Sequence, residues 1–259
     1  MFSEAKAIYL ATRKRHDQLF NTYFMRPIAG FAVAVLGRTP VTPNQLTLVS
    51  VILMAVAAAI FIAWPDPRAD WVGVIVLEAS YLFDCCDGML ARHKKLASKQ
   101  GHLFDFFTDE TKAVMLVGAL AIRQWRTGGY GLLGEPWPAG SAWFLVAGIV
   151  AVAILASASS LTNFVRRPEI SGRETPVEAH YETLAQGDES PSLSPSLVRR
   201  LAGLVVTFLR FLNHYPSHIW LFGLVGRLDV FFWVYAAINL LYLGRGWLGL
   251  VLRFGRSGG

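Results

Sequence analysis

Four aspartates in one short stretch are the residues of this chain whose types and spacing suggest chemistry. Asp84 and Asp87 are followed by Asp105 and Asp109, and long apolar runs lie on both sides of the stretch. Ionisable side chains within a membrane segment are costly and are by default functional. Residues three or four apart share one face of an α-helix, so each aspartate pair is expected on one face of its own helix.

Small and basic residues continue the first aspartate face. Gly88 and Ala91 follow Asp84 at four and seven residues, and Arg92 comes one turn after Gly88. Small side chains let a ligand approach the backbone beside the acids. A guanidinium group binds a phosphate through two parallel hydrogen bonds. This face therefore suits a phosphorylated ligand.

A second stripe carries the other two acids. Gly101, Asp105 and Asp109 recur every four residues, and Lys112 continues the stripe one turn further. Four carboxylates that face one another cannot all stay ionised without counter-charge. Carboxylate oxygens are preferred ligands of Mg²⁺ and Mn²⁺. Two such ions suit phosphoryl chemistry because they hold the attacking and the leaving oxygen.

The composition indicates where this chemistry takes place. Of 259 residues, 54% are hydrophobic and 16% are charged, whereas a soluble domain carries about 25% charged residues. These values are typical of an integral membrane protein. The net charge of +6 is expected to reflect basic loops beside anionic lipid rather than a nucleic-acid partner.

The apolar runs predict an all-α integral membrane protein of about six transmembrane helices. The fifth run is the weakest, since it contains Arg210, Asn213, His214 and Pro216, and it could be broken or partly interfacial. A membrane-spanning helix needs about 20 residues. The runs of that length are 45–64, 71–90, 103–125, 141–165, 201–226 and 229–252.

The predicted spans divide the chain into two parts. Residues 1–40 are expected to form a cytoplasmic amphipathic segment on the membrane surface, with Leu19, Phe20, Tyr23 and Phe24 on one helical face. The transmembrane catalytic domain is expected at 41–259. It contains a polar loop near 166–198, rich in Pro, Ser and Glu, whose composition is typical of a solvated linker.

The distribution of basic residues predicts the orientation of the spans. With six spans and both termini in the cytoplasm, the opposite loops would hold only Arg68, Arg126 and Arg227. Cytoplasmic loops carry the excess of Lys and Arg in membrane proteins. This multi-pass arrangement places the aspartate stretch at the cytoplasmic face.

The aspartate stretch resembles the signature of the CDP-alcohol phosphotransferase (phosphatidyltransferase) family. The residues read Asp84-x2-Asp87-Gly88-x2-Ala91-Arg92-x8-Gly101-x3-Asp105-x3-Asp109, with every fixed position filled at the family's spacing. The TPNQLT start of the first span, Thr42 to Thr47, and the six-span layout also resemble the family.

The resemblance implies an enzyme of phospholipid synthesis. Such enzymes transfer a phosphatidyl or similar group from a CDP-linked donor to an alcohol and release CMP, and they are typically homodimers. It also implies that Asp84, Asp87 and Asp105 hold two divalent cations, Mg²⁺ or Mn²⁺. Asp109 lies at the same cations and is the implied base for the acceptor hydroxyl.

The resemblance also implies a nucleotide site. Gly88 and Ala91 make room for the cytidine nucleotide, and Arg92 contacts its phosphates. The remaining implied nucleotide-site residues are Asn44, Thr47 and Gly101.

Basic residues are expected to bind a phosphorylated acceptor. Arg166, Arg167, Arg199 and Arg200 flank the polar loop, and their alternative role is ordinary anchoring at the cytoplasmic face. Lys112 could orient a phosphate or form an ion pair with Asp109.

The identity of the substrates stays open at the level of sequence. CDP-diacylglycerol is the preferred donor, and a CDP-linked small alcohol such as CDP-choline is the alternative. The acceptor could be glycerol 3-phosphate, inositol or its phosphate, serine, or choline. A cation transporter is disfavoured, because the acids cluster at one face and no inverted repeat is visible; an inactive scaffold is disfavoured by the intact motif.

Overall fold

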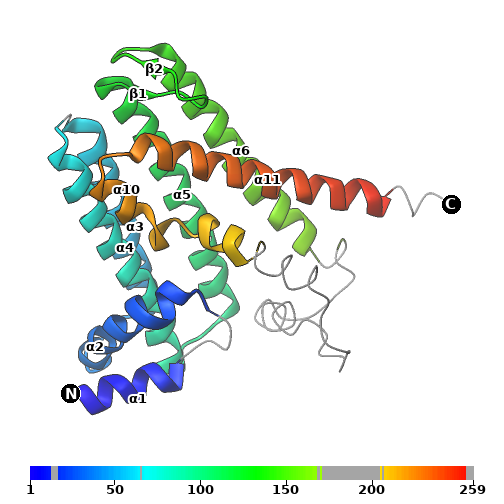
Figure 1. The fold of residues 1–259 in the computed structure, drawn as a ribbon. Helices are drawn as coiled ribbons and strands as arrows, with labels where there is room; N and C mark the ends of the chain where they lie inside the picture. The colour runs from blue at the N-terminus through cyan, green and yellow to red at the C-terminus, as the bar shows by residue number, and fades with distance from the viewer. Residues whose placement is uncertain (13–16, 65, 168–169, 171–204, 206, 255–259) are drawn as a thin grey trace. The chain divides into compact units, whose positions relative to one another are not determined.

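The computed structural model describes the chain except for residues 13–16, 65, 168–169, 171–204, 206 and 255–259. The described residues are almost entirely helical (Figure 1), which confirms the all-α prediction. Among them, one antiparallel pair forms a small sheet, β1 (Gly129–Tyr130) with β2 (Pro136–Trp137). The chain divides into two compact units, and α3, α4 and α5 each contribute residues to both.

The first unit comprises Met1–Leu53, Leu77–Thr108 and Glu174–Ser217. Its core is built from fully buried residues that include Ala29, Val33, Met89 and Leu90. Helix α1 packs against α2. The helical elements that contribute to this unit include α1 (Phe2–Thr12), the π-helical turn η1 (Asn21–Met25), α2 (Arg26–Leu36), α3 (Pro43–Ala63), α4 (Arg68–His93), α5 (Lys99–Thr127) and the 3₁₀ turn η2 (Tyr215–Ser217).

The chain reversal between α4 and α5 sets the spacing of the two aspartate pairs. Lys95 adopts a left-handed conformation, and the Leu96 amide donates to the Ala91 carbonyl at 2.8 Å, which closes α4 with a Schellman-type cap. The Ser98 hydroxyl accepts a 3.0 Å hydrogen bond from the Gly101 amide and caps the start of α5. Both helices therefore extend beyond the predicted spans, and only a short turn joins them.

The second unit comprises Met54–Val76, Asp109–Arg173 and His218–Gly259. It adds α6 (Ala142–Arg166), α10 (Ile219–Leu224) and α11 (Leu228–Phe254), and α11 packs against both α6 and α10. Gly148 lets α5 and α6 approach closely, because a Cβ at this position would lie 2.4 Å from the Ala121 Cβ.

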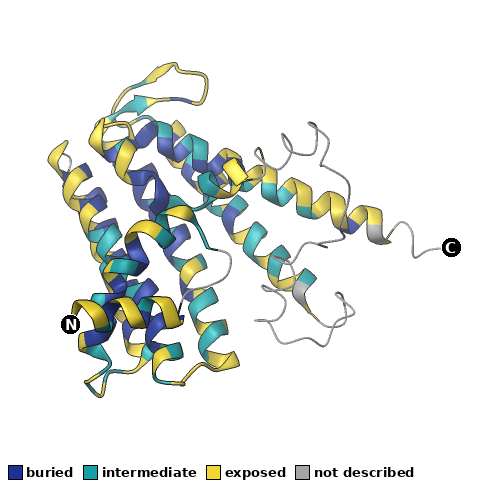
Figure 2. Cartoon of the chain, turned by 60° about the horizontal axis from the view of Figure 1, so that its bottom comes forward, coloured by how far each residue is buried: buried dark blue, intermediate teal, exposed yellow. Residues whose placement is uncertain are grey.

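Within the described part of the chain, three helices are long and apolar enough to cross a membrane: Pro43–Ala63, Ala142–Val165 and Leu228–Leu252. They expose large apolar side chains such as Ile52, Ile149 and Trp247, and Figure 2 shows α11 largely exposed toward its C-terminal end. Exposed apolar surface of this extent marks a membrane or protein contact. Together with their length, it identifies a membrane protein.

The count of six spans stays a prediction. Helices α4 and α5 have 26 and 29 residues, but they carry the charged residues of the aspartate stretch. The fifth predicted span is interrupted: residues 207–213 are helical, η2 follows at Tyr215–Ser217, and α10 begins at Ile219. This break lies at His214 and Pro216, two of the residues that weakened the sequence prediction.

Candidate active site

The structure brings three of the four aspartates together. Carboxylate oxygens of Asp84, Asp105 and Asp109 lie within 4.8 Å of one another. Asp84 comes from α4, and the other two come from consecutive turns of the continuous helix α5. The four-residue spacing seen in the sequence accounts for the pairing of Asp105 with Asp109, and the packing of α4 beside α5 adds Asp84. It is a set of hard oxygen donors of the kind that divalent cations prefer.

The fourth aspartate is held by a different helix. The Thr47 hydroxyl of α3 donates a 2.5 Å hydrogen bond to Oδ2 of Asp87, and both side chains are buried, with Asp87 only 4% exposed. Hydrogen bonds to an ionised acceptor are stronger than neutral ones. Thr47, expected beside the nucleotide, thus contacts a predicted metal ligand directly.

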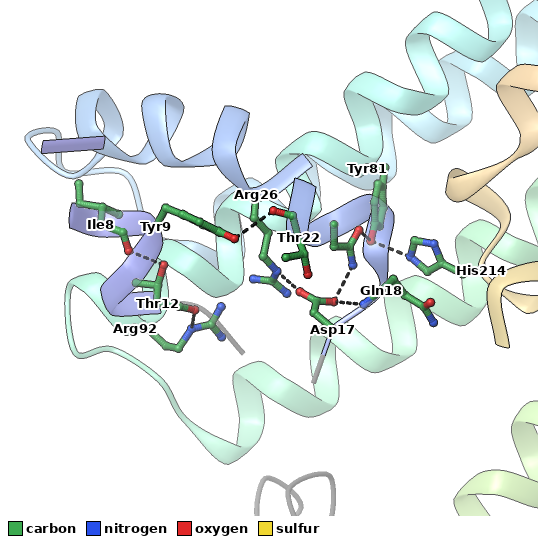
Figure 3. Close-up of polar contacts among 11 residues, drawn as sticks. Ile8, Tyr9, Thr12, Asp17, Gln18, Thr22, Arg26, Tyr81, Arg92 and His214 are labelled. Carbon is green, nitrogen blue, oxygen red and sulfur yellow. Dashed lines mark hydrogen bonds and ion pairs between the residues drawn. The ribbon is translucent and has the colours of Figure 1, made fainter. Parts of the chain in front are cut away.

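Arg92 of α4 contacts the end of α1 at Thr12 (Figure 3). Its Nε donates to the Thr12 carbonyl at 3.0 Å. A Cβ added to Gly88 would stand 3.5 Å from Nη1 and 3.7 Å from Nη2 of Arg92. The outer edge of the guanidinium group therefore lies beside Gly88, one turn from Asp84, and Ala91 is half-buried next to it.

Gly101 and Asn44 meet where the starts of α5 and α3 approach each other. A Cβ on Gly101 would lie 3.1 Å from the Ser98 hydroxyl and 3.6 Å from Oδ1 of Asn44. The Asn44 side chain is exposed in the first turn of α3. A ligand that touches Asn44 would therefore also lie beside the Gly101 backbone.

Lys112 forms the ion pair that the sequence raised as an alternative. Its Nζ lies 2.8 Å from Oδ1 of Asp109; the Lys112 side chain is 1% exposed and that of Asp109 is 50% exposed. A lysine this deeply buried contacts the carboxylate rather than solvent. The Asp109 carboxylate is thus fixed on one side and accessible on the other.

The predicted acceptor arginines are only partly described. Arg167 is exposed at the C-terminal end of α6. The backbone of Arg166 ends α6, but its side chain lies outside the described residues, as do Arg199 and Arg200 entirely.

A chain of hydrogen bonds that the sequence analysis did not predict crosses the first unit (Figure 3). The Tyr81 hydroxyl donates to Oδ1 of Asn21 at 2.5 Å, and the Asn21 amide donates to Asp17 at 2.9 Å. Tyr81 also lies 2.7 Å from Nε2 of His214. Tyr81 is one turn before Asp84, so this chain ties the N-terminal segment to α4 next to the aspartates.

Asp17 ends this chain in a buried ion pair with Arg26. Burial raises the pKa of the Asp17 carboxyl, but the Arg26 charge and the hydrogen bonds from Asn21 and Arg26 lower it further, so that its pKa lies below the usual value. No pattern in the sequence signals these contacts, because they join residues from separate elements.

Known proteins share features with this chain. A family model described as CDP-alcohol phosphatidyltransferase matches residues 40–186, which include all four aspartates. A curated protein of Rubrobacter xylanophilus, named bifunctional IPC transferase and DIPP synthase, is 34% identical over 84 residues. That match covers 32% of this chain and only 18% of the length of the curated protein.

Proposed function

The chain belongs to the CDP-alcohol phosphatidyltransferase family, and from this premise we propose that it transfers a phosphatidyl group from CDP-diacylglycerol to an alcohol and releases CMP. The observation that carries this proposal is the grouping of Asp84, Asp105 and Asp109 on the same unbroken helical pair that bears Gly88 and Arg92. Carboxylates bind the divalent cations that accompany a nucleoside diphosphate. A guanidinium group binds its phosphate oxygens directly.

The acidic residues fit two divalent cations. Three carboxylates within 4.8 Å repel one another, and the Lys112 ammonium supplies only one compensating charge. We therefore assign two cations, Mg²⁺ or Mn²⁺, to Asp84, Asp87, Asp105 and Asp109. Bound cations of this kind would neutralise the donor diphosphate and the charge that develops on CMP.

The donor is bound by residues of α3, α4 and α5. The Arg92 guanidinium contacts the diphosphate, and Gly88 and Ala91 leave space for the nucleotide beside α4. Asn44 and Gly101 lie together at the starts of α3 and α5 and complete the nucleotide site. Thr47 acts through Asp87, whose carboxylate it fixes.

Asp109 is the base of the reaction. Its carboxylate is half-exposed and is held by Lys112, so one oxygen faces an incoming hydroxyl. The acceptor oxygen forms a bond to the phosphatidyl phosphorus as its proton passes to Asp109. The bond from that phosphorus to the bridging oxygen of CMP breaks, and CMP leaves with the bonding electrons.

The membrane helices explain how such a donor reaches the site. The acyl chains of CDP-diacylglycerol remain among lipids along α3, while the CDP group sits at the cytoplasmic face. We further propose six spans, with residues 1–40 as a surface segment and 41–259 as the catalytic domain, and a homodimer as the functional state.

A phosphorylated alcohol is the acceptor class we favour. Arg167 is exposed at the end of α6, directly after Arg166, and Arg199 and Arg200 supply further positive charge in the sequence. A CDP-linked small alcohol is the second candidate donor, because the motif contacts only the CDP half. Inositol phosphate and glycerol 3-phosphate are therefore tested among the acceptors.

The proposed reaction is tested by CMP release from the protein in lipid nanodiscs with Mg²⁺ or Mn²⁺. CDP-diacylglycerol is offered with glycerol 3-phosphate, inositol, inositol phosphate, serine or choline, and CDP-choline is offered with diacylglycerol. We expect release from CDP-diacylglycerol that depends on one phosphorylated acceptor. Release of CMP from CDP-choline alone would show that the donor is a CDP-linked small alcohol. No release of CMP from any pair of donor and acceptor would refute the proposal.

A further inference from the structure

The N-terminal helix holds a residue of the proposed nucleotide site. Thr12 is the last residue of α1, and its carbonyl accepts the 3.0 Å hydrogen bond from Nε of Arg92. The last carbonyls of a helix have no partner within the helix and carry partial negative charge. The end of α1 is thus a suitable acceptor for a guanidinium group. It lies outside residues 40–186, the part matched by the family model.

This contact orients the Nε edge of the guanidinium group. With Nε directed at Thr12, the planar group turns its two terminal nitrogens toward Gly88, where they lie 3.5 and 3.7 Å from the position of an added Cβ. An arginine side chain loses about 2 kcal/mol of rotamer entropy when it is ordered. If the guanidinium group is already oriented in the free protein, less entropy is lost when a diphosphate binds to it.

Helix α1 is itself firmly placed against its neighbours. Ala5 and Ile8 are buried, and the Tyr9 hydroxyl donates to the Thr22 carbonyl at 3.0 Å (Figure 3). Gly30 of α2 allows the closest approach, because a Cβ there would stand 2.9 Å from the Ala5 carbonyl oxygen. The position of Thr12 therefore depends on the packing of α1 on α2.

We propose that α1 is a positioning element of the nucleotide site: through the Thr12 carbonyl it orients Arg92 for the diphosphate of the donor. This inference rests on the proposed function, since it requires that Arg92 binds the donor. It assigns a part in substrate binding to a segment that precedes the matched family region. It predicts that displacement of α1 weakens nucleotide binding even when Arg92 and all four aspartates are intact.

The test is a double-mutant cycle between Gly30→Val and Arg92→Ala, with the dissociation constant for CDP measured by calorimetry. Gly30→Val pushes α1 away from α2, and we expect it to weaken CDP binding roughly tenfold, the size of one hydrogen bond to a charged group. In the Arg92→Ala background the same change should alter the constant by less than about twofold, because the two substitutions act on one contact. In turnover, Gly30→Val should raise the KM for the donor and leave kcat unchanged.

Gly249→Val is the matched control, since Gly249 is exposed on α11 and an added Cβ meets nothing within 4 Å. If the Gly30→Val variant does not fold, Tyr9→Phe replaces it in the double-mutant cycle. This substitution weakens the attachment of α1 by removing only the hydrogen bond from Tyr9 to the Thr22 carbonyl. Independent effects of the two substitutions, or unchanged CDP affinity in a folded α1 variant, would overturn the inference. Failure of the wild-type protein both to bind CDP and to release CMP would instead overturn the proposed function.

Discussion

The hydroxyl of Thr47 and the carboxylate of Asp87 form a buried 2.5 Å hydrogen bond that joins α3 to α4. The bond gives the first turns of α3 a defined part in the site, because Asp87 cannot turn without losing its donor. A buried acceptor deprived of its hydrogen bond costs about 1–3 kcal/mol. Thr47 thus sets the conformation of a carboxylate that we propose as a cation ligand.

Thr47→Val is expected to weaken the response to metal. Valine keeps the shape of the side chain but offers no donor, so the Asp87 carboxylate loses the hydrogen bond from α3. We expect the Mg²⁺ or Mn²⁺ concentration for half-maximal CMP release to rise roughly tenfold, in line with one lost hydrogen bond to a charged group. Thr47→Ser should restore the wild-type value, and an unchanged metal requirement in Thr47→Val would contradict this role.

Gly88→Ala is expected to weaken nucleotide binding without lowering the stability of the fold. An added Cβ meets no atom closer than Nη1 of Arg92 at 3.5 Å, which is ordinary contact. Alanine also favours the helix by about 1 kcal/mol over glycine, so the thermal midpoint should stay the same or rise. The methyl group nevertheless fills space assigned to the nucleotide, and the KM for the donor should increase. A variant with unchanged KM would place the nucleotide elsewhere.

Lys112→Met distinguishes the two roles considered for this lysine. If Lys112 holds Asp109, loss of the ion pair lets the carboxylate move, and kcat should fall roughly tenfold while the KM for the acceptor is kept. Lys99→Met, at the start of α5, removes an exposed charge and serves as the control. A rise in the acceptor KM at constant kcat would show instead that Lys112 binds the acceptor.

The Asp17–Arg26 pair predicts sensitivity to acid. The pKa of Asp17 is lowered in the folded protein, so its contribution to stability is present above the unfolded-state pKa of about 3.9. This contribution is lost as the pH falls through the lower folded-state value. Thermal midpoints measured in detergent between pH 7 and pH 3 should therefore decline on acidification.

Asp17→Asn provides the comparison. Removal of one partner from a buried pair costs about 3 kcal/mol, so the variant should be less stable at pH 7. Its further loss toward pH 3 should be smaller than that of the wild-type protein, because the titrating group is gone. Parallel pH curves for the two proteins would show that the pair does not contribute to acid sensitivity.

Local periodicity predicted much of the site. Asp105 and Asp109 share a face of α5 because they lie four residues apart, and that spacing is visible in the sequence. The short turn between α4 and α5 brings Asp84 to them. The partners of Asp87 and Arg92 were not predictable in this way. Thr47 and Thr12 lie 40 and 80 residues away from them along the chain, and only tertiary packing brings such residues into contact.

In the fold, too, the helices could be predicted from local sequence, whereas contacts between distant segments could not. The apolar composition of α3, α6 and α11 predicted membrane helices, and these three have the length and hydropathy to span. The turn after α4 carried no glycine signal, because Lys95 takes the left-handed position itself. At the break after residue 213, His214 contacts the Tyr81 hydroxyl of α4 at 2.7 Å, a long-range contact that the sequence does not signal.

We propose that the aspartates form a metal-dependent site for transfer from a CDP-alcohol, with Asp109 as base. The measurement that tests this compares CMP release by wild-type protein and Asp109→Asn in nanodiscs that contain CDP-diacylglycerol, with the acceptor identified in the panel. We expect metal-dependent release by the wild type, abolished by chelation with EDTA. We also expect at least a hundredfold lower kcat in Asp109→Asn, because a general base is lost, while CDP still binds. Release that persists in Asp109→Asn, or that does not require the cation, would show that the aspartates do not act in this way.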